Sequence, residues 1–258
     1  KQVERPAGGR EDATMTHPEG PRRWSTPDGA ILRAIRRPDG HWSVRLPQEH
    51  PDTWPALVAA ATQGGCGTLI VSRPADEDEV YGRALRRAGF LPVRTETLWR
   101  LPVAAVPTIP MRARHELVPV TEVAPEAVAV LDNAIRDDIP GTSGWQGTGA
   151  QLAESLDDPD FDPALYLIAR HPRTGILDGL VRVWNRHPEP RLGCIGVTAP
   201  WRRTSLALAL LQNVAYTLRA RGVTHITAET DQTNRSSQLM ALNHGGTDLG
   251  RSVEWSRS

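Results

Sequence analysis

Lysine is almost missing from this 258-residue chain, which carries only Lys1, so nearly all of its 30 basic side chains are arginine. The phosphate loop of nucleotide-binding enzymes, G-x-x-x-x-G-K-[ST], needs a lysine that reaches the phosphates. Because the single lysine stands at the first position, that loop cannot occur here, and we exclude phosphate-loop nucleotide enzymes. Arginine is the default cation of the chain, so one arginine in isolation says little about function.

Cysteine is also scarce, with only Cys66 and Cys194, and both lie in predicted buried strands. We expect them to be reduced packing residues, and we expect no bound metal. No run of 18 apolar residues and no hydrophobic signal core is present, which predicts a cytoplasmic protein with no membrane partner. Acidic and basic side chains balance at 30 each without a basic stripe, so we expect no nucleic-acid partner.

The first 25 residues are rich in Pro, Gly, Glu and Arg and have no hydrophobic period. Such a segment buries too little apolar surface to offset the entropy of ordering it, so we predict that residues 1–25 are disordered. Met15 is a candidate natural start, which would place residues 1–14 upstream of the native chain.

Strand and helix signals alternate through the rest of the chain, and after residue 113 they follow the order β-α-α-β-β-β-α-β-α-β. This order predicts a mixed α/β fold, in which a mostly antiparallel sheet is flanked by helices. The predicted strands cover 30–36, 41–46, 68–72, 91–101, 116–119, 164–170, 176–185, 191–197, 224–230 and 248–255. The predicted helices cover 53–63, 76–87, 125–136, 150–156, 203–221 and 236–243.

An internal repeat links the two parts of the chain. GCGTLIVSRP aligns with RGVTHITAET, and RRAGFLPVRTETLWRL aligns with NHGGTDLGRSVEWSR, at an offset of about 156 residues that places Trp99 opposite Trp255. Two matches in the same order indicate a duplicated unit. We therefore predict a partial domain over 26–104, a linker over 105–113 and a complete domain over 114–258.

One strand-to-helix corner stands out, in the run GCIGVTAPWRRTSLALALL between residues 193 and 211. A predicted strand ends at Val197, a turn follows, and Arg202 and Arg203 are predicted to lie on the first turn of the next helix. A helix start presents unpaired N–H groups and the positive end of the helix dipole, and pyrophosphate is its usual ligand. Two guanidinium groups would strengthen this anion site, because charge-assisted bonds to phosphate are strong.

The corner resembles the phosphate-binding motif of the GNAT superfamily of N-acetyltransferases, R/Q-x-x-G-x-G/A at a helix start after a strand. A second family element, a strand followed by asparagine and a short helix ending in glycine, is similar to ITAETDQTNRSSQLMALNHGG, which contains Asn234. The resemblance covers residues 114–255 and implies acetyl-coenzyme A as the cofactor. The repeated layout is similar to that of tandem-domain members such as mycothiol synthases, with a degenerate N-terminal copy. The residues that match the first motif are Arg202, Arg203, Thr204, Ser205, Leu206 and Ala207.

Two positions depart from the family pattern, because Arg203 and Ser205 stand where the family has glycine. Glycine lets a phosphate approach the backbone without meeting a Cβ. The small Ser205 side chain could itself bond a phosphate oxygen, and the Arg203 side chain could point outward. In the N-terminal part the equivalent place reads PQEHPD, where two carboxylates would repel a pyrophosphate and proline removes a backbone donor. We expect no cofactor there.

The resemblance implies direct attack of an acceptor amine on the acetyl thioester. A backbone N–H between Ile195 and Val197, on the strand before the corner, would donate to the thioester oxygen. Glu229 is our candidate general base, because it lies near the end of the strand expected to splay away from that one. His187, Glu189 and an ordered water relay are the alternatives.

The family often places a proton-donating tyrosine seven positions after the asparagine, and Ala241 stands there instead. Ser237 or His244 could replace it, or the thiolate could leave unprotonated, since a thiol has a pKa of about 8.5. Asn234 is expected to act at the active site by bonding the cofactor arm, or to cap the following helix.

The acceptor is expected to be a small-molecule amine that binds near the loop between the first two helices of the C-terminal domain. Asp137, Asp138 and Trp145 combine negative charge with an aromatic ring there, which suits a cationic amine. The alternative is that both aspartates are turn residues facing water. Trp184, on a central predicted strand, is either a pocket wall or part of the core. Both a monomer and a homodimer stay open.

These features together predict an acetyl-coenzyme A-dependent N-acetyltransferase with one active and one degenerate domain. Two alternatives stay open. One is a non-catalytic module that binds coenzyme A or scaffolds a partner, which the missing tyrosine and altered glycines favour. The other is an acyltransferase that uses a longer acyl group or aminoacyl-tRNA.

Overall fold

The computed structural model describes residues 20–109, 114–142 and 144–258. In the C-terminal part the element order agrees with the predicted order, and most boundaries agree within two residues. The strands are β6 (Glu116–Pro119), β7 (Tyr166–Arg170), β8 (Leu177–Trp184), β9 (Arg191–Val197), β10 (His225–Asp231) and β11 (Thr247–Arg257). The helices are α3 (Pro125–Arg136), α4 (Gly149–Ser155), α5 (Leu206–Ala220) and α6 (Arg235–Asn243).

The N-terminal part begins with a strand that the sequence did not predict. Residues 22–25 were expected to be disordered, but they form an edge strand, because they pair with the following strand and Trp24 packs on the N-terminal core. The Arg22 side chain also donates to the Gly64 carbonyl oxygen at 2.8 Å. Residues 1–19, the rest of that predicted segment, lie outside the described residues. The elements are β1 (Arg22–Ser25), β2 (Ile31–Arg36), β3 (Trp42–Arg45), α1 (Trp54–Gln63), β4 (Leu69–Pro74), α2 (Arg83–Arg87) and β5 (Leu91–Pro102).

Two further expectations for the N-terminal part are wrong. The helix predicted over 76–87 is divided into a short 3₁₀ turn, a π-helical segment and α2, and Gly82, a poor helix former, ends the π-helical segment. Cys66 is buried but lies in the turn before β4 rather than in a strand, whereas Cys194 lies in β9 as expected. Both thiols are free.

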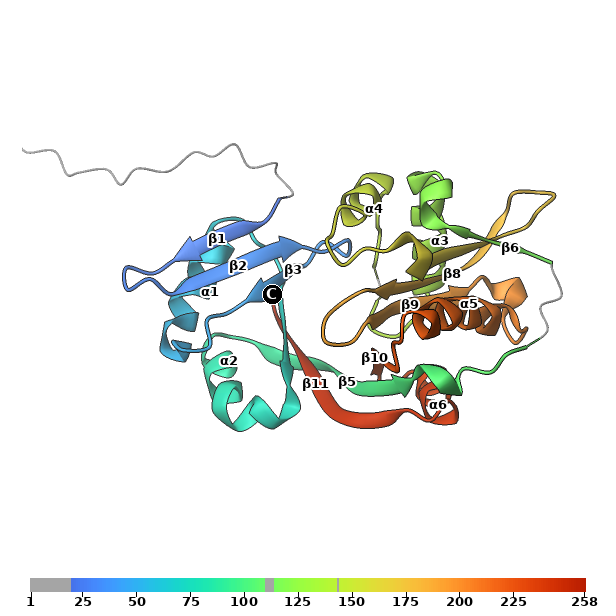
Figure 1. Ribbon diagram of the computed structural model, residues 1–258. Helices are drawn as coiled ribbons and strands as arrows, with labels where there is room; N and C mark the ends of the chain where they lie inside the picture. The colour runs from blue at the N-terminus through green and yellow to red at the C-terminus, as the bar shows by residue number, and fades with distance from the viewer. Residues whose placement is uncertain (1–19, 110–113, 143) are drawn as a thin grey trace, which may run out of the picture.

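All strands of the described residues form one open sheet, in the order β1-β2-β3-β4-β11-β5-β10-β9-β8-β7-β6. The β3–β4 and β9–β10 pairs are parallel, and the other pairs are antiparallel. This confirms the mixed, mostly antiparallel sheet with flanking helices that the sequence predicts (Figure 1).

The last strand of each half of the chain pairs with the other half. β5 pairs with β10, and β11, the last strand of the chain, pairs with β4. β5 and β11 also pair with each other, and Figure 1 shows both running between the two groups of helices. The registers differ by one position from the sequence alignment, since Trp99 lies opposite Ala228, whereas Trp255 lies opposite Val71, the counterpart of Thr227. The two segments that align in the sequence nevertheless take equivalent places in the sheet, each beside the other half.

Three apolar cores hold the helices to the sheet. α5 packs on Leu167, Ala169 and Val181, whereas α3 packs on the alternate residues Ile168 and Leu180. Because successive strand residues point to opposite faces, α3 and α5 cover opposite sides of the same strands (Figure 1). The third core joins α1 and α2 to β2, β3 and β4.

Neither a membrane span nor a metal cluster occurs in the part of the chain that the structure describes. Its longest helix, α5, has 15 residues, and none is long and apolar enough to cross a bilayer. No group of three or more His, Cys, Asp or Glu side chains within these ranges is arranged to hold a metal ion.

Candidate functional site

β9 and β10 separate in the middle of the sheet. They pair over only two positions, the second of which places Ala228 opposite Leu192. Beyond that pair the strands diverge, and residues 193–195 and 229–231 line a cavity of about 310 Å³. The splay expected from the sequence is present, and the cavity opens where the ladder between these strands ends.

The walls of this cavity come from both halves of the chain. Ile139, Thr142 and Trp145, from the loop between α3 and α4, form one side. The N-terminal half contributes Arg37, Ser72, Arg94 and Glu96, and β11 contributes Glu254. The loop is tied across the opening, because Gln146 N–H donates to the Pro38 carbonyl oxygen at 3.2 Å and Arg94 donates to the Gly141 carbonyl oxygen at 3.2 Å.

Trp145 is the one predicted acceptor residue that reaches the cavity. The Arg136 guanidinium lies 4.3 Å from the centre of its ring, and Arg136 is itself held by Asp132 at 2.7 Å. The buried indole Nε1 of Trp145 has no hydrogen-bond partner among the described residues.

The other predicted acceptor residues do not line the cavity. Asp137 ends α3, and both it and Asp138 are exposed. Trp184 packs against β9, where a Cβ on Gly193 would come within 2.8 Å of its Nε1, and the Arg182 guanidinium lies 5.2 Å from its ring. The interpretation of Trp184 as a packing residue is therefore favoured.

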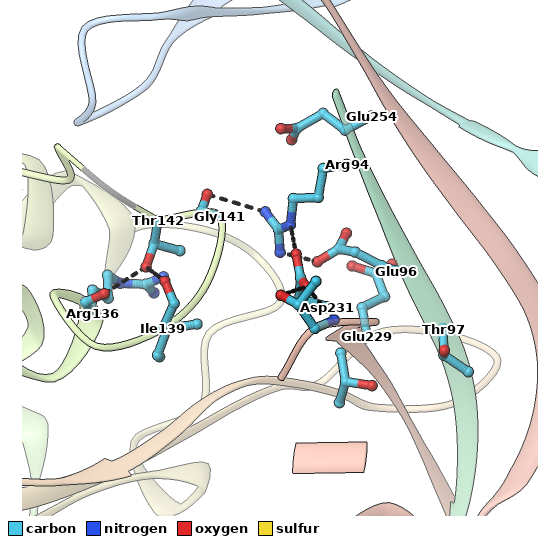
Figure 2. Close-up of polar contacts among 12 residues, drawn as sticks. Arg94, Glu96, Thr97, Arg136, Ile139, Gly141, Thr142, Glu229, Asp231 and Glu254 are labelled. Atoms are coloured by element: carbon cyan, nitrogen blue, oxygen red, sulfur yellow. Dashed lines mark hydrogen bonds and ion pairs between the residues drawn. The ribbon is translucent and has the colours of Figure 1, made fainter. Parts of the chain in front are cut away.

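A charged network that the sequence did not predict crosses the cavity floor (Figure 2). Arg94 of β5 donates to Asp231 at 2.8 Å and to Glu96. Burial raises the pKa of Glu96 and outweighs the opposite effect of the Arg94 charge, which lowers that pKa. The nearby carboxylates of Glu229 and Glu254 raise the pKa of Glu96 further. Burial also opposes ionisation of Asp231, but hydrogen bonds from Thr233 and Arg94 lower the pKa of that carboxyl below its usual value.

The sequence missed these groups for a topological reason. Arg94 and Glu96 belong to the N-terminal half, and Glu254 belongs to the last strand, so nothing local linked them to the C-terminal corner. The repeat aligned β5 with β11, but only their exchange between the halves brings β5 beside β10 and β11 beside β5.

Glu229 lies at the start of the splay and lines the cavity, where its carboxylate pairs with Arg191. The two rival bases lie outside the cavity lining, in the turn between β8 and β9. His187 is exposed, and Glu189 pairs with Arg100, whose hydrogen bond holds the pKa of Glu189 below its usual value. Of the three candidates, Glu229 is the one placed where an acceptor amine could reach it.

The corner before α5 differs from the sequence prediction in one respect. Arg202 and Arg203 precede the helix, which begins at Leu206, because Arg203 has a left-handed backbone with φ of 61°. That conformation interrupts a right-handed helix. Left-handed backbone is also what glycine adopts without strain, and Arg203 occupies a position where the resembling family has glycine.

Some of the backbone N–H groups at this corner already donate hydrogen bonds within the protein. The N–H groups of Arg202 and Thr204 donate to the Ala199 and Trp201 carbonyl oxygens at 3.3 Å, and Leu206 N–H donates to Thr204 Oγ1 at the same distance. No acceptor among the described residues is found for the N–H groups of Arg203, Ser205, Ala207 and Leu208. These four N–H groups are the donors that stay unbonded at the start of α5.

Two residues assigned to different ligands lie in contact. Arg202, expected to bind the cofactor, pairs with Asp138, expected to bind the acceptor, at the exposed mouth of the corner. A phosphate that binds Arg202 would have to compete with this carboxylate. Asp138 therefore lies against the corner before α5 and does not line the cavity.

Replacing Arg203 by glycine is expected to stabilise the protein. The change removes the strain of a left-handed side-chain residue and restores some entropy to the unfolded chain, for a net gain of about 0.5–1 kcal/mol in the free energy of unfolding. Denaturant unfolding measures it. Arg202→Gly is the matched control, because Arg202 has an ordinary extended backbone with φ of −64°, and glycine there should destabilise. Equal effects at both positions would contradict the explanation.

Asn234 caps α6, as one of the two sequence hypotheses stated. Its side-chain oxygen accepts the Ser237 N–H at 3.1 Å, and both residues line the cavity. Ala241 is buried in the core and offers no proton donor, and His244 Nδ1 is engaged with the Met240 carbonyl oxygen at 2.8 Å, outside the cavity lining. Of the two residues suggested to replace the missing tyrosine as proton donor, Ser237 lines the cavity and His244 does not.

Comparisons with solved structures find the same fold. A GCN5-related N-acetyltransferase from Sphaerobacter thermophilus matches with a TM-score of 0.65 and 19% identity over 95% of this chain and 82% of that chain. A tandem GNAT protein from the clavulanic acid biosynthesis pathway matches with a TM-score of 0.61 and 17% identity over 88% of this chain and 78% of that chain. A GCN5-related N-acetyltransferase from Kribbella flavida matches with a TM-score of 0.56 and 16% identity over 92% of this chain and 90% of that chain.

These identities are too low to carry activity or substrate from one protein to another. No protein-family model matches the chain, and no curated protein matches it. The structural matches do extend over both halves of the chain, so the likeness includes the exchanged strands and not only the corner before α5. The fold of this chain is that of GNAT acetyltransferases, with a mixed open sheet flanked by helices.

Proposed function

We propose that this protein is an acetyl-coenzyme A-dependent N-acetyltransferase that acts on a small primary amine by direct attack in a ternary complex. One observation carries the proposal: the splay of β9 from β10 opens into a charged cavity, beside a helix start with unbonded amides. A thioester held at that corner could extend toward the cavity, where the amine would enter.

The corner has donors suited to a pyrophosphate. The N–H groups of Arg203, Ser205 and Ala207 would hold the phosphate oxygens, and the helix dipole of α5 favours negative charge there. Arg202 would add a charge-assisted bond once it leaves Asp138. When bound, acetyl-coenzyme A supplies the electrophilic carbonyl carbon of the thioester.

The chain's own groups would then control charge and protons. A backbone N–H of β9 near Ile195 would donate to the carbonyl oxygen as negative charge develops on it. Glu229 would take the proton from the attacking amine nitrogen, and Arg191 would orient its carboxylate. With alanine at position 241, the departing sulfur would leave as a thiolate, which a pKa of about 8.5 allows.

Glu229→Gln is expected to reduce kcat by about a hundredfold or more with any accepted amine, because glutamine cannot take a proton. His187→Ala should change it by less than about threefold, since His187 is exposed and outside the cavity lining. Steady-state rates of coenzyme A release measure both. A larger loss for His187→Ala would remove Glu229 as the base.

The function itself is tested by two measurements. Calorimetry should detect coenzyme A binding, and a screen of small amines should show coenzyme A release from acetyl-coenzyme A together with the acetylated product. Absence of binding would overturn the proposal.

A second candidate is a non-catalytic coenzyme A-binding module, which the engaged Arg202 and the strained Arg203 favour. Binding without release across the amine library would support it. Release from a longer acyl donor but not from acetyl-coenzyme A would support an acyltransferase of different donor specificity.

A further inference from the structure

The cavity is lined by four arginines and four carboxylates, and two of these arginines are each shared between two carboxylates. Arg94 is shared by two carboxylates, Glu96 and Asp231. Arg37 is likewise shared, by Asp39 at 2.8 Å and Glu254 at 3.0 Å. Each of these two networks therefore carries one negative charge more than its arginine neutralises.

Three of the carboxylates form a row across the central strands, one each on β10, β5 and β11. Glu229 pairs in register with Leu98, and Glu254 pairs with Arg94, so each is a diagonal neighbour of Glu96. Diagonal residues on one face of a sheet lie roughly 7–8 Å apart, so the row runs from the splay toward the N-terminal half. Figure 2 shows the three side chains on the same side of the sheet.

Two carboxylates of the row are shielded from water, which makes their negative charge costly. The side chains of Glu96 and Glu254 are only 16% and 13% exposed, whereas that of Glu229, at the splay, is 30% exposed. The raised pKa of Glu96, to which both neighbouring carboxylates contribute, is the expected consequence of burial with too few cations nearby. A bound cation would supply the missing counter-charge, and charged groups attract more strongly in such a poorly hydrated place.

We propose that the acceptor is an extended amine with a second cationic nitrogen, which binds between Glu96 and Glu254 while the reacting nitrogen lies at Glu229. The inference rests on the proposed function, since it needs the reacting end at the splay. It gives the N-terminal half a role in selecting the substrate, through Arg37 and Glu96 and the exchanged strand that carries Glu254.

Three acceptors of matched length test the second nitrogen. Octane-1,8-diamine carries it, nonylamine replaces it with a methyl group, and 9-aminononanoate replaces it with a carboxylate. We expect kcat/KM for the diamine to exceed that for nonylamine by about tenfold or more, as charge-assisted bonds in a shielded site require, and 9-aminononanoate to be the poorest. Butane-1,4-diamine is too short to reach from Glu229 to a point between Glu96 and Glu254, and it should lose most of this preference.

Glu254→Gln tests the site of recognition, because glutamine keeps the shape of the side chain and removes its charge. The ratio of kcat/KM for diamine over monoamine should fall to near one, mainly through a higher KM for the diamine. Glu122→Gln is the matched control, since Glu122 is an exposed glutamate in the turn after β6, outside the cavity lining, and should leave the ratio unchanged. Thermal unfolding of both variants shows that each is folded.

The outcomes separate this inference from the function on which it rests. If nonylamine or 9-aminononanoate is acetylated as well as octane-1,8-diamine, the acceptor class is wrong and the acetyltransferase stands. If the diamine preference survives Glu254→Gln, the second nitrogen does not bind there and the assignment is wrong. If no amine of any class is acetylated although coenzyme A binds, the proposed function itself has failed.

Discussion

Coenzyme A affinity is expected to fall by more than about a hundredfold when Arg202→Glu is combined with Ser205→Glu. The first change replaces a phosphate-binding guanidinium with a repelling carboxylate. The second puts another carboxylate at the N-cap of α5, where the unbonded amides converge. Losing two charge-assisted bonds of about 1.5–3 kcal/mol each accounts for the size of the effect. Isothermal titration calorimetry measures it directly.

Two controls make that experiment specific. Arg173→Glu with Thr174→Glu makes the same change of charge in the exposed turn between β7 and β8 and should leave the affinity within about twofold. Asp138→Asn frees Arg202 from its carboxylate partner and should tighten coenzyme A binding. Unchanged affinity in the Arg202–Ser205 double variant would place the cofactor elsewhere and end the case for this corner.

The second large effect concerns the exchanged strands. Trp99 comes from the N-terminal half but is buried in the core under α5, where its Nε1 donates to Thr230 Oγ1 at 2.7 Å. Trp255 comes from the last strand but is buried in the core under α1. Trp99→Ala and Trp255→Ala should each lower the free energy of unfolding by about 3–5 kcal/mol, through lost burial and the cavity left behind.

The region that loses stability in each variant tests whether each tryptophan supports the core of the other half of the chain. Native-state hydrogen exchange should show that Trp99→Ala lowers protection chiefly in α5 and β10, and that Trp255→Ala lowers it chiefly in α1 and β4. If either alanine variant fails to fold, the Trp→Phe variants, which lose less volume, serve the same comparison. The reverse pattern, with each substitution loosening its own half, would contradict the observed strand order.

Local patterns predicted most of the elements of the C-terminal part, because each pattern reports on interactions close in sequence. Val128, Leu131 and Ile135 have helical spacing, and they form the buried face of α3 with the boundaries expected. β9 was predicted to the residue from a short apolar run between turns. The predicted start of the helix after the corner is three residues before the observed start of α5. No local sequence pattern indicates that Arg203 adopts a left-handed backbone.

The sequence likewise identified some residues of the candidate site and missed others. Trp145, Glu229 and Asn234 reach the cavity, and a resemblance based on short motifs had selected them. Asp138, which the sequence assigned to the acceptor, pairs with Arg202 and lies outside the cavity lining. Arg94, Glu96 and Glu254 were missed, because their importance depends on which strands become neighbours.

The sequence by itself determined the alternation of strands and helices and the place of the strand-to-helix corner, since both follow from side chains within a few positions of one another. Only the tertiary structure decided that β5 and β11 exchange places. That choice depends on pairing between residues far apart in the chain, which no local pattern encodes. It places Glu96 beside Glu229 and Glu254 beside Glu96, and it makes one charged cavity out of two halves.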